Sequence, residues 1–475
     1  MVISSSELKF PDGFLWGVAT SHFQVEGNPK EMAGRLSDWS MWTNCDGKII
    51  DKSNADKACE FFYRYKDDIA LCQSMNLNAF RLSLNWAALV PLPNAELDPE
   101  QVDYYRKVLT ELKAKGMKTF VSLFHFCLPN WLADIGGWTN PKTVREFARF
   151  AELAAQEFGD LVDFWITINE PLVYAYQSYI AGIWTPGYEG DFLLAFKSIR
   201  SMLEGHAAAY HAIHSHVKNA QVSVAIHWRL FSARNPLNPL DQFARYLRNH
   251  VFNHIFLLAI REGRLIFPFP VNCERVVQSI SGPITGLKDS MDYIGLNYYT
   301  HETCMFQWSY PPDFFGQQAE THQYAKTGLG WEIYPHGLYD VLTKELPEYS
   351  VNSQGKQLPT YITENGMATK FPAHMTDGAW SLNDTERVNF LTEHIKEMHR
   401  AIADGANVKG YLHWSLLDNF EWADGLEARF GLVRVTFPTQ ERTIRESGKV
   451  YAEIARNNGL GMHMLQPDER AVTST

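Results

Sequence analysis

The sequence lacks the short motifs that usually mark a nucleotide site, a disulfide framework or a membrane span. It contains no GxGxxG or Walker-type loop, no CxxC pair and no apolar run long enough to cross a bilayer. It has no block of five or more lysines and arginines, and its net charge is −11. We therefore expect neither nucleic acid nor a membrane as a partner. Without a phosphate loop or a cationic cluster at its active-site mouth, an enzyme that uses NAD or phosphate is also disfavoured.

Cysteine is scarce and scattered through the chain. The six cysteines lie in apolar segments: Cys45, Cys59, Cys72, Cys127, Cys273 and Cys304. This distribution indicates free, mostly buried thiols in a reducing compartment. The opening residues, MVISSSELKFPDGF, lack the basic and apolar stretches of a signal peptide. We expect a soluble, cytoplasmic protein.

Aromatic side chains, by contrast, are plentiful. They make up 13% of the chain, which contains 14 tryptophans. Aromatic rings commonly hold the apolar faces of sugar rings, although tryptophan also fills protein cores. The composition is therefore a hint of a carbohydrate site and no more.

Eight short apolar runs predict strands, and segments with helical periodicity lie between them. The runs cover residues 14–20, 79–86, 118–125, 163–170, 221–228, 292–299, 360–366 and 408–416. Two of the helical segments begin with a capping residue and a proline and stop at a glycine, over 98–116 and 140–159. A third covers 383–405. Alternating strands and helices predict a parallel sheet.

Eight such units favour a closed (β/α)8 TIM barrel over an open, doubly wound sheet. An open sheet would have edge strands and would usually carry a glycine-rich phosphate loop, which this sequence lacks. With 475 residues the chain exceeds a minimal barrel. We therefore expect a single α/β catalytic domain over residues 1–475, with long βα loops around the active-site mouth.

Two predicted strands that lie far apart in the sequence both end in a glutamate. Glu170 closes the fourth run, in TINEP, and Glu364 closes the seventh, in YITENG. A carboxylate at the end of a buried strand is costly unless it is used. In a (β/α)8 barrel the carboxyl ends of all strands meet at one mouth, so both side chains should face one pocket. Two facing carboxylates suit glycoside hydrolysis.

Nine motifs occur along the chain in this order: FLWGVATSHFQVEG, FRLSLNW, FHFCLPNWL, GGWTN, TINEP, GLNYYT, WEIYPHGLY, YITENG and WSLLDNFEWADG. Together they resemble the retaining β-glycosidases of glycoside hydrolase family 1. The match runs from about Phe10 to about Tyr451, which leaves residues 452–475 as a C-terminal extension. The family is a single (β/α)8 domain, so the resemblance agrees with the strand count.

The resemblance implies that Glu170 is the general acid/base and Glu364 the nucleophile. Tyr299 resembles the family's hydrogen-bond donor to the nucleophile, and Arg81 resembles the positive charge beside it. Glu364 has to be ionised to attack the anomeric carbon, whereas Glu170 has to hold a proton until the leaving group departs. The retaining mechanism predicts that the two carboxyl groups lie about 5–5.5 Å apart.

A sugar-binding set also follows from the resemblance. Asn169 resembles the residue that contacts the 2-hydroxyl, where a hydrogen bond can strengthen in the transition state. Trp414 resembles the floor under the sugar ring, Trp422 a donor of an indole N–H, and Trp331 the aglycone platform. The other expected substrate contacts are Gln24, His125, Asn297 and Glu421.

Two positions narrow the substrate class that the resemblance implies. Family members that act on 6-phosphorylated sugars have a small hydroxyl residue in place of Glu421 and a lysine after it, and FEWADG has neither. Thioglucosidases of the family have glutamine in place of Glu170. The expected substrates are therefore unphosphorylated O-glycosides.

Three positions depart from the family pattern. Phe126 stands where HWD would supply a tryptophan, so one polar contact to the sugar, of the order of 1 kcal/mol, is lost or supplied otherwise. Leu172 follows NEP where tryptophan is usual, and we expect it to alter the aglycone wall. His336 replaces a glutamate in WEIYPHG. These changes leave the reaction class intact but blur acceptor preference and the ranking of glucose and galactose.

We therefore predict a retaining exo-β-glucosidase that releases terminal β-D-glucosyl residues from small molecules such as cellobiose and aryl or plant β-glucosides. We expect no metal or other cofactor. The covalent intermediate also allows transglycosylation, which the wall at Leu172 is expected to favour. Specificity for β-galactosides or β-fucosides is an alternative, and so is a catalytically inactive sugar-binding barrel. The sequence predicts no oligomeric state.

Several of these side chains also have a simpler interpretation. Trp414 and Trp422 are compatible with core packing, and Phe126 is as compatible with the core as with a sugar-facing position. His125 is compatible with a hydrogen-bonded core histidine, and Arg81 with the anchor of a structural carboxylate. Four histidines in GHAAAYHAIHSH have helical spacing, but no acid or cysteine completes a metal ligand set, so we expect an ordinary helix: His206, His211, His214 and His216.

Overall fold

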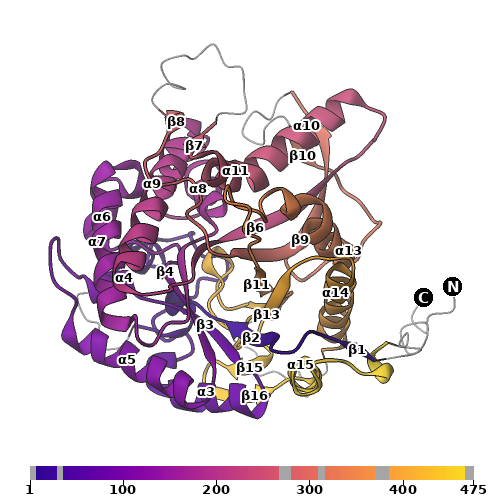
Figure 1. Ribbon diagram of the computed structural model, residues 1–475, viewed down its shortest axis with the longest axis horizontal. Coiled ribbons are helices and arrows are strands. Elements are labelled where there is room, and N and C mark those ends of the chain that lie inside the picture. The colour runs from indigo at the N-terminus through magenta and orange to yellow at the C-terminus, as the bar shows by residue number, and fades with distance from the viewer. Residues whose placement is uncertain (1–6, 29–35, 267–279, 309–315, 371–383, 466–475) are drawn as a thin grey trace.

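Eight parallel strands close into a barrel in the computed structural model, which describes residues 7–28, 36–266, 280–308, 316–370 and 384–465. The strands are β2 (Leu15–Ala19), β3 (Ala79–Ser83), β4 (Lys118–Phe124), β5 (Phe164–Asn169), β6 (Val222–Ala233), β9 (Ile294–Phe306), β11 (Thr360–Asn365) and β13 (Val408–Trp414). Neighbours follow the order β9–β11–β13–β2–β3–β4–β5–β6, and pairing of β6 with β9 closes the ring. The predicted (β/α)8 barrel is confirmed (Figure 1).

Helices surround the strands and cover the outside of the barrel (Figure 1). They include α3 (Phe61–Ser74), α5 (Pro99–Ala114), α7 (Pro141–Phe158), α8 (Pro171–Tyr179), α9 (Phe192–His216), α10 (Pro239–Asn249), α11 (Ile255–Glu262), α13 (Pro335–Asp340), α14 (Thr385–Ala403) and α15 (Glu446–Asn457). As predicted, the side chains of Asp98 and Asn140 cap α5 and α7 by accepting backbone N–H bonds, and proline follows each. The predicted start of the third segment at Asn383 lies outside the described residues.

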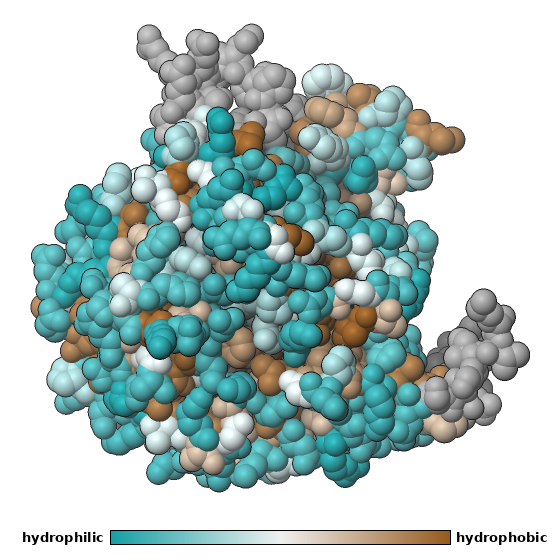
Figure 2. Space-filling view, in the orientation of Figure 1, coloured by the Kyte–Doolittle hydropathy of each residue, from teal (hydrophilic) through white to brown (hydrophobic). Residues whose placement is uncertain are grey.

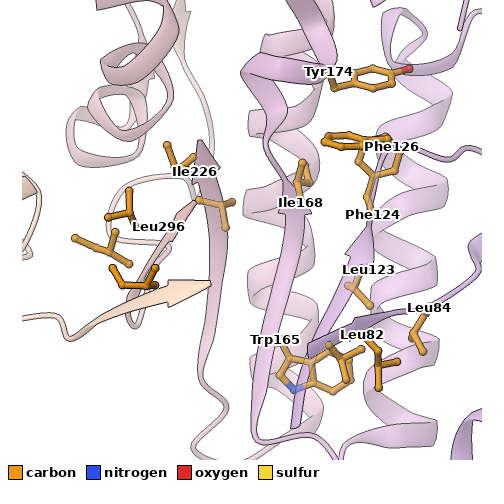
Figure 3. Close-up of a cluster of buried hydrophobic side chains, with 14 of the residues drawn as sticks. Leu82, Leu84, Leu123, Phe124, Phe126, Trp165, Ile168, Tyr174, Ile226 and Leu296 are labelled. Atoms are coloured by element: carbon orange, nitrogen blue, oxygen red, sulfur yellow. The ribbon is translucent and has the colours of Figure 1, made fainter. Parts of the chain in front are cut away.

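Alternate residues along the strands serve two cores. Leu123 of β4 belongs with Trp165 of β5 to the main cluster of buried hydrophobic side chains (Figure 3). Phe120, three residues earlier, instead stacks on Phe164 with ring centroids 4.2 Å apart and shares a second cluster with Leu412 of β13. β4 and β13 are not neighbours in the sheet, so this second cluster crosses the barrel interior. Each such buried side chain contributes about 1.5–3 kcal/mol. The interior is packed, which leaves the carboxyl ends of the strands for a site.

The strands that lead to Glu170 and Glu364 both lose regular register just before the glutamate. Pairing of β5 with β6 shifts between Ile166 and Asn169, and pairing of β11 with β9 shifts between Ile362 and Glu364. Irregularities of this kind re-aim side chains at the rim of a barrel. Local strand geometry therefore helps to turn both carboxylates toward the mouth.

Strands β6 and β9 extend further than the sequence predicts. They end at Ala233 and Phe306 and remain paired to their ends, and β10 (Gly316–Gln318) adds antiparallel to β9. In Figure 1 this extension points toward α10 and β10 at the upper right. It brings Arg229 of β6 to the mouth of the barrel.

Residues 452–465 belong to the same fold. α15 continues to Asn457, and β17 (Gly459–Leu460) pairs with β1 (Leu8–Lys9). The end of the motif match near Tyr451 is therefore not a structural boundary, because α15 continues through it without a break.

The molecular surface in Figure 2 is largely hydrophilic, with hydrophobic residues scattered singly or in small groups. Within the ranges that the structure covers, no helix is long and apolar enough to cross a membrane. The described cysteines are free thiols as predicted; Cys45 is exposed, and the buried ones are Cys59, Cys72, Cys127 and Cys304. Cys273 lies outside the described residues.

Candidate active site

A cavity of about 220 Å³ lies at the carboxyl ends of the barrel strands. His125 reaches it directly after β4, and Glu170 directly after β5. Glu364 and Trp414 line it from the ends of β11 and β13. Strands from different parts of the sequence thus deliver side chains to one space, as the barrel predicts.

Both oxygens of the Glu364 carboxylate accept hydrogen bonds from other strands. Nη1 of Arg81 on β3 donates to Oε1 in a short ion pair, and the hydroxyl of Tyr299 on β9 donates to Oε2 over 2.6 Å. Arg81 is fully buried, and its Nη2 also donates to Oδ1 of Asn169 over 2.6 Å. These donors fix the orientation of Glu364 and stabilise its charged form.

Glu170 belongs to the same hydrogen-bond network. The side-chain amide of Asn297 donates to Oε1 of Glu170 over 2.8 Å and to Oδ1 of Asn169 over 3.1 Å. Thr363 donates in turn to Oδ1 of Asn297 over 2.6 Å, which orients that amide. Nδ1 of His227 lies 3.4 Å from Oε1 of Glu170. Glu170 therefore has a neutral amide as its donor, whereas Glu364 has a guanidinium.

The charge of the two glutamates follows from these neighbours. Burial raises the pKa of Glu364 to about 7. The positive charge of Arg81 opposes this rise, and the negative charge of Glu170 adds to it. The Glu364 carboxyl therefore changes its charge near neutral pH. Because Arg81 and Tyr299 bind Glu364, that carboxylate is the better place for the negative charge.

The other end of the cavity carries a third buried carboxylate, Glu421. Nε2 of Gln24 donates to its Oε2 over 3.1 Å and to Oδ1 of Asn419 over 3.2 Å. Burial, followed by the charges of Asp424 and Glu364, raises the pKa of Glu421 well above its usual range. A side chain in this state can exchange hydrogen bonds with hydroxyl groups of a ligand.

Aromatic rings border the same end. The ring of His125 is stacked on those of Trp414 and Trp422, with centroids 5.8 and 6.0 Å apart. Burial and the Arg81 charge hold the pKa of His125 well below its usual range, so the imidazole is neutral. Its Nε2 lies 3.2 Å from Nδ2 of Asn169. A neutral imidazole tied to an amide is suited to bind a hydroxyl group.

Three residues that line the cavity have a left-handed backbone conformation. The φ angles are 69° for Phe126, 44° for Glu170 and 47° for Trp422. Residues with a Cβ rarely adopt this region, and such strain concentrates at functional sites. All three side chains contribute to the lining of the cavity.

Most of the predicted site residues line this one cavity: His125, Phe126, Asn169, Glu170, Tyr299, Trp331, Glu364, Trp414, Glu421 and Trp422. Three others lie behind the lining and bind its side chains: Gln24, Arg81 and Asn297. The structure brings these residues together, and their roles toward a substrate remain predictions.

The prediction that Leu172 forms the aglycone wall is wrong. Leu172 is 6% exposed and lines a separate apolar pocket against α9. The face of α8 that lines the cavity consists of Val173, Tyr176 and Gln177, which have the spacing i, i+3, i+4 of one helical face. Residue 172 is one position out of phase with that face, so its side chain points away.

His336 also lies away from the cavity. Its Nδ1 lies 3.1 Å from Oε2 of Glu397, and its Nε2 lies 3.5 Å from Oδ1 of Asp340. The residue therefore links α13 to α14, and this departure from the family pattern does not reach the aglycone side.

Phe126 occupies a packed position at the edge of the cavity. It is 2% exposed, and its ring lies 4.7 Å from Trp184 and 5.2 Å from Trp422. Trp184, in the loop after α8, lines the cavity and was not predicted as a site residue. The family pattern has a tryptophan in place of Phe126, and in this chain the indole of Trp184 packs against Phe126.

The sequence gives no cationic cluster at the mouth, but the structure places two arginines there. Arg229 of β6 and Arg248 of α10 both line the cavity, together with His227 and Phe252. The two arginines lie in different segments of the sequence and belong to none of the motifs. Their proximity results from the packing of α10 against the extension of β6.

The four histidines on α9 bind different partners. Nδ1 of His206 lies 2.7 Å from the Thr167 hydroxyl, and Nε2 of His214 lies 2.8 Å from Asp292. Nε2 of His211 lies 2.8 Å from the carbonyl of Gly286, and that of His216 lies 3.1 Å from Glu152. They serve as links between α9 and its neighbours, as expected for an ordinary helix.

Comparison with known proteins gives a match over nearly the whole chain. The sequence model described as Glycosyl hydrolase family 1 matches residues 6–460. A Beta-glucosidase A from Thermotoga maritima is 33% identical over 458 residues, which are 95% of this chain and 99% of that protein. A Beta-galactosidase from Pyrococcus woesei is 32% identical and covers 95% of this chain and 98% of its own length.

Solved structures agree with the sequence comparison. The family 1 β-glucosidase from Thermotoga maritima in complex with isofagomine lactam superposes with a TM-score of 0.86 at 32% identity. The superposition covers 96% of this chain and 100% of that one. Fold and sequence similarity therefore extend over the barrel and its loops together.

Proposed function

Because this chain belongs to glycosyl hydrolase family 1 and is thus a glycoside hydrolase, we propose that it is a retaining exo-β-glucosidase with Glu364 as nucleophile and Glu170 as general acid/base. One observation carries the assignment of roles. Arg81 and Tyr299 bind the two oxygens of Glu364, whereas Glu170, in the same cavity, accepts a hydrogen bond from the neutral amide of Asn297. A nucleophile needs the first environment and a proton donor the second.

In the first step Glu364 attacks the anomeric carbon while Glu170 gives its proton to the departing oxygen. The bond from the anomeric carbon to the aglycone breaks as the bond to Oε of Glu364 forms, with an oxocarbenium-like transition state between them. Asn169, held by Arg81 and Asn297, is the proposed partner of the 2-hydroxyl. Its contact strengthens as charge develops on the sugar.

In the second step water replaces the aglycone. Formation of the ester neutralises Glu364 and removes its negative charge from the site. Glu170 then takes a proton from water, which attacks the anomeric carbon and releases glucose with the β configuration retained. An alcohol or sugar in place of water gives transglycosylation. Leu172 does not line the cavity, so it gives no reason to expect that transfer is favoured over hydrolysis.

The buried side chains around Glu421 support an exo-acting enzyme on a single glucosyl unit. Gln24, Glu421 and His125 offer polar groups to the sugar hydroxyls, and Trp414 and Trp422 offer ring faces. A phosphorylated sugar would place its charge beside Glu421, Glu170 and Glu364, which disfavours it. We propose cellobiose and aryl β-glucosides as substrates.

Chemical rescue of two glycine variants tests the roles. Hydrolysis of 4-nitrophenyl β-D-glucoside should fall by about 10³-fold or more in Glu364→Gly and in Glu170→Gly, with the exposed Glu393→Gln as a matched control that keeps full activity. Added azide should yield α-glucosyl azide with Glu364→Gly and β-glucosyl azide with Glu170→Gly, as identified by NMR. The reverse pattern, or full activity in either variant, would contradict the assignment.

A β-galactosidase or β-fucosidase is the second candidate, favoured by the similarity to a protein named Beta-galactosidase. A panel of 4-nitrophenyl β-D-glucoside, β-D-galactoside and β-D-fucoside compares the three by kcat/KM. A glucoside value below that of either other substrate would replace the first proposal. Absence of hydrolysis on the whole panel would leave a sugar-binding barrel without catalysis.

We also propose a cytoplasmic location. The free thiols of the described cysteines support a reducing compartment. Fractionation of cells that produce the protein, with cytoplasmic and exported markers, tests this proposal.

A further inference from the structure

A serine, a histidine and a glutamate form a hydrogen-bonded chain on the extension of β6 and β9. Nε2 of His301 lies 2.7 Å from Oγ of Ser232, and Nδ1 of the same ring lies 2.6 Å from Oε2 of Glu332. Ser232 belongs to β6 and His301 to β9, and Glu332 lies between β10 and α13. Serine nucleophile, histidine base and orienting carboxylate are linked in this order in serine hydrolases of unrelated folds.

This chain of side chains lies away from the catalytic glutamates. Ser232, His301 and Glu332 are not among the residues that line the cavity. His227, which approaches Glu170 to 3.4 Å, precedes Ser232 by five residues, or about 16 Å of strand. A reaction at Ser232 would therefore be separate from glycoside hydrolysis.

The hydrogen bonds determine which nitrogen of His301 carries the proton. The Glu332 carboxylate accepts a hydrogen bond from Nδ1–H, so in the neutral imidazole Nε2 has a lone pair. That lone pair faces the hydroxyl of Ser232, which donates to it. His301 is thus oriented to take the proton of Oγ when that oxygen attacks an electrophile.

Glu332 is itself held in place by two threonines. Its Oε1 accepts a hydrogen bond from the hydroxyl of Thr321, which leaves Oε2 for His301. Its backbone carbonyl accepts from the hydroxyl of Thr300 over 2.9 Å. A carboxylate fixed at both its side chain and its backbone keeps the imidazole in one tautomer and one rotation.

The base is buried and the nucleophile is exposed. The side chains of His301 and Glu332 are 3% and 1% exposed, whereas Ser232 is exposed to solvent. The rings of Tyr324 and Tyr334 pack on the imidazole, with centroids 5.4 and 4.8 Å away. A base held in this way needs little reorganisation during a reaction, and a reagent in solution can reach Oγ.

The backbone next to Ser232 limits the class of substrate. The N–H of Arg234 donates to the carbonyl of Cys304 over 2.8 Å, so the sheet uses this donor. A donor engaged in this way does not stabilise the oxyanion of an acyl transfer, and such stabilisation is typically worth about 10²–10³-fold. The site therefore suits small esters whose leaving group departs readily.

We propose that Ser232, His301 and Glu332 form a second catalytic site, which hydrolyses small activated carboxylic esters such as aryl acetates. Ser232 is the nucleophile and His301 the base, and Glu332 is a positioning residue that acts through the imidazole. The proposal does not depend on the β-glucosidase function.

The reaction has two steps. Oγ of Ser232 attacks the carbonyl carbon of the ester and gives its proton to Nε2 of His301; the bond to the phenol oxygen then breaks, and the phenol leaves with that proton. Water next attacks the acetyl ester on Ser232. It loses a proton to His301, which returns the proton to Oγ as acetate departs.

A fluorophosphonate tests the nucleophile directly. Oγ of an activated serine forms a stable phosphonate ester with this reagent as fluoride leaves, and the Oγ proton passes to the base. Peptide mass spectrometry should place the label on Ser232 of the full-length protein. The rate of labelling should fall by about 10²-fold in His301→Gln, which lacks the base.

Hydrolysis of 4-nitrophenyl acetate tests the acyl intermediate. The wild type should release about one equivalent of 4-nitrophenolate in a rapid burst, followed by a slower steady rate, because the ester on Ser232 forms faster than water removes it. Ser232→Ala should show no burst. Mass spectrometry of the quenched wild type should find the acetyl group on Ser232.

Ser215→Ala is the matched control. Ser215 is an exposed serine of α9 whose hydroxyl donates to the carbonyl of Ala212 over 2.7 Å and not to a base. Its loss should leave the label and the burst unchanged. Glu332 is left intact, because it follows Trp331, which lines the catalytic cavity. Circular dichroism reports whether each variant is folded.

Two results would overturn the proposal. One is a label on other residues alone, or a burst of equal size in the wild type and Ser232→Ala. The other is equal labelling of Ser232 in the wild type and a folded His301→Gln, which would leave the three side chains as a structural hydrogen-bond network. If His301→Gln does not fold, Ser232→Ala still decides, since it changes one exposed side chain.

Discussion

The two ends of the cavity are built from different kinds of sequence. The glycone end consists of motif residues such as His125, Glu421 and Trp422, which stand at or just beyond strand ends and are bound to one another. The aglycone end consists of α8, the extension of β6 and α10, which contribute Tyr176 and Arg229 from outside the motifs. The contrast indicates that one end fixes the reaction and the sugar, and the other end selects the leaving group.

The largest expected effect is that of Glu170→Gln, and its size should depend on the acidity of the leaving group. Glu170→Gln should lower kcat for cellobiose by about 10³–10⁴-fold, because a poor leaving group needs the proton. The first step with 2,4-dinitrophenyl β-D-glucoside should fall by less than about tenfold, since that phenolate leaves unaided. Rapid-quench kinetics measure both values, and an equal loss with both substrates would remove Glu170 from the role of acid.

Next in size is the effect of the cation beside the nucleophile. Glu364 is ionised above its pKa of about 7, so kcat/KM of the wild type should fall as the pH falls through about 7. Arg81→Met should lower kcat by about 10²–10³-fold and move this acid limb to higher pH, because the Arg81 charge lowers the pKa of Glu364.

Arg81→Lys is the matched control, since it keeps the charge near Glu364 while losing the forked geometry. Its acid limb should lie between those of the wild type and Arg81→Met in a pH profile of kcat/KM. An acid limb that stays in place in Arg81→Met would show that Arg81 does not govern the ionisation of the nucleophile.

A smaller effect at the glycone end should be uniform across substrates. Glu421→Gln should lower kcat/KM by about 10–100-fold for cellobiose, aryl glucosides and glucosyl fluoride alike, because the side chain is expected to contact only the sugar. A kinetic panel of these substrates checks the prediction. A loss restricted to one leaving group would break the proposed division of the cavity.

The matching change at the aglycone end should be small and selective. Tyr176→Ala should lower kcat/KM for aryl glucosides about three- to tenfold and leave glucosyl fluoride nearly unchanged, since fluoride does not reach α8. The same panel serves for the measurement. Equal losses on both substrates would place Tyr176 with the glycone end instead.

The smallest kinetic effect is expected for Leu172, which faces away from both ends. Leu172→Ala should change kcat/KM and the ratio of transfer to hydrolysis by less than about twofold, while it destabilises the protein by about 2–4 kcal/mol through the cavity that it leaves. Chemical denaturation and product analysis with added acceptor measure the two quantities. A marked change in the transfer ratio would restore Leu172 to the aglycone wall.

The sequence predicts the barrel and the glycone end well for a physical reason. Buried parallel strands are short, continuous apolar runs, and residues that follow them must meet at one mouth in a closed barrel. Glu170 and Glu364 could thus be placed in one pocket although they lie far apart in the chain. Their hydrogen-bond partners, such as Arg81 and Asn297, are also strand residues and were found with them.

The aglycone end escapes prediction because its geometry depends on how secondary elements pack. The rotation of α8 about its axis decides that Val173, and not Leu172, reaches the cavity. The helix begins directly after Glu170, whose backbone is strained, so the sequence does not fix which face of the helix turns inward. Arg229 and Arg248 meet only because β6 and β9 stay paired beyond the barrel and α10 packs on them. The apolar residues that continue from Trp228 in WRLFSA are the sequence signal of that longer strand.

The most direct test of the account is the capture of the covalent intermediate. Incubation with 2,4-dinitrophenyl 2-deoxy-2-fluoro-β-D-glucoside, followed by peptide mass spectrometry, should place a single fluoroglucosyl ester on Glu364, with loss of activity in proportion to labelling. An ester on another residue, or hydrolysis with no covalent adduct and inverted product, would contradict the account.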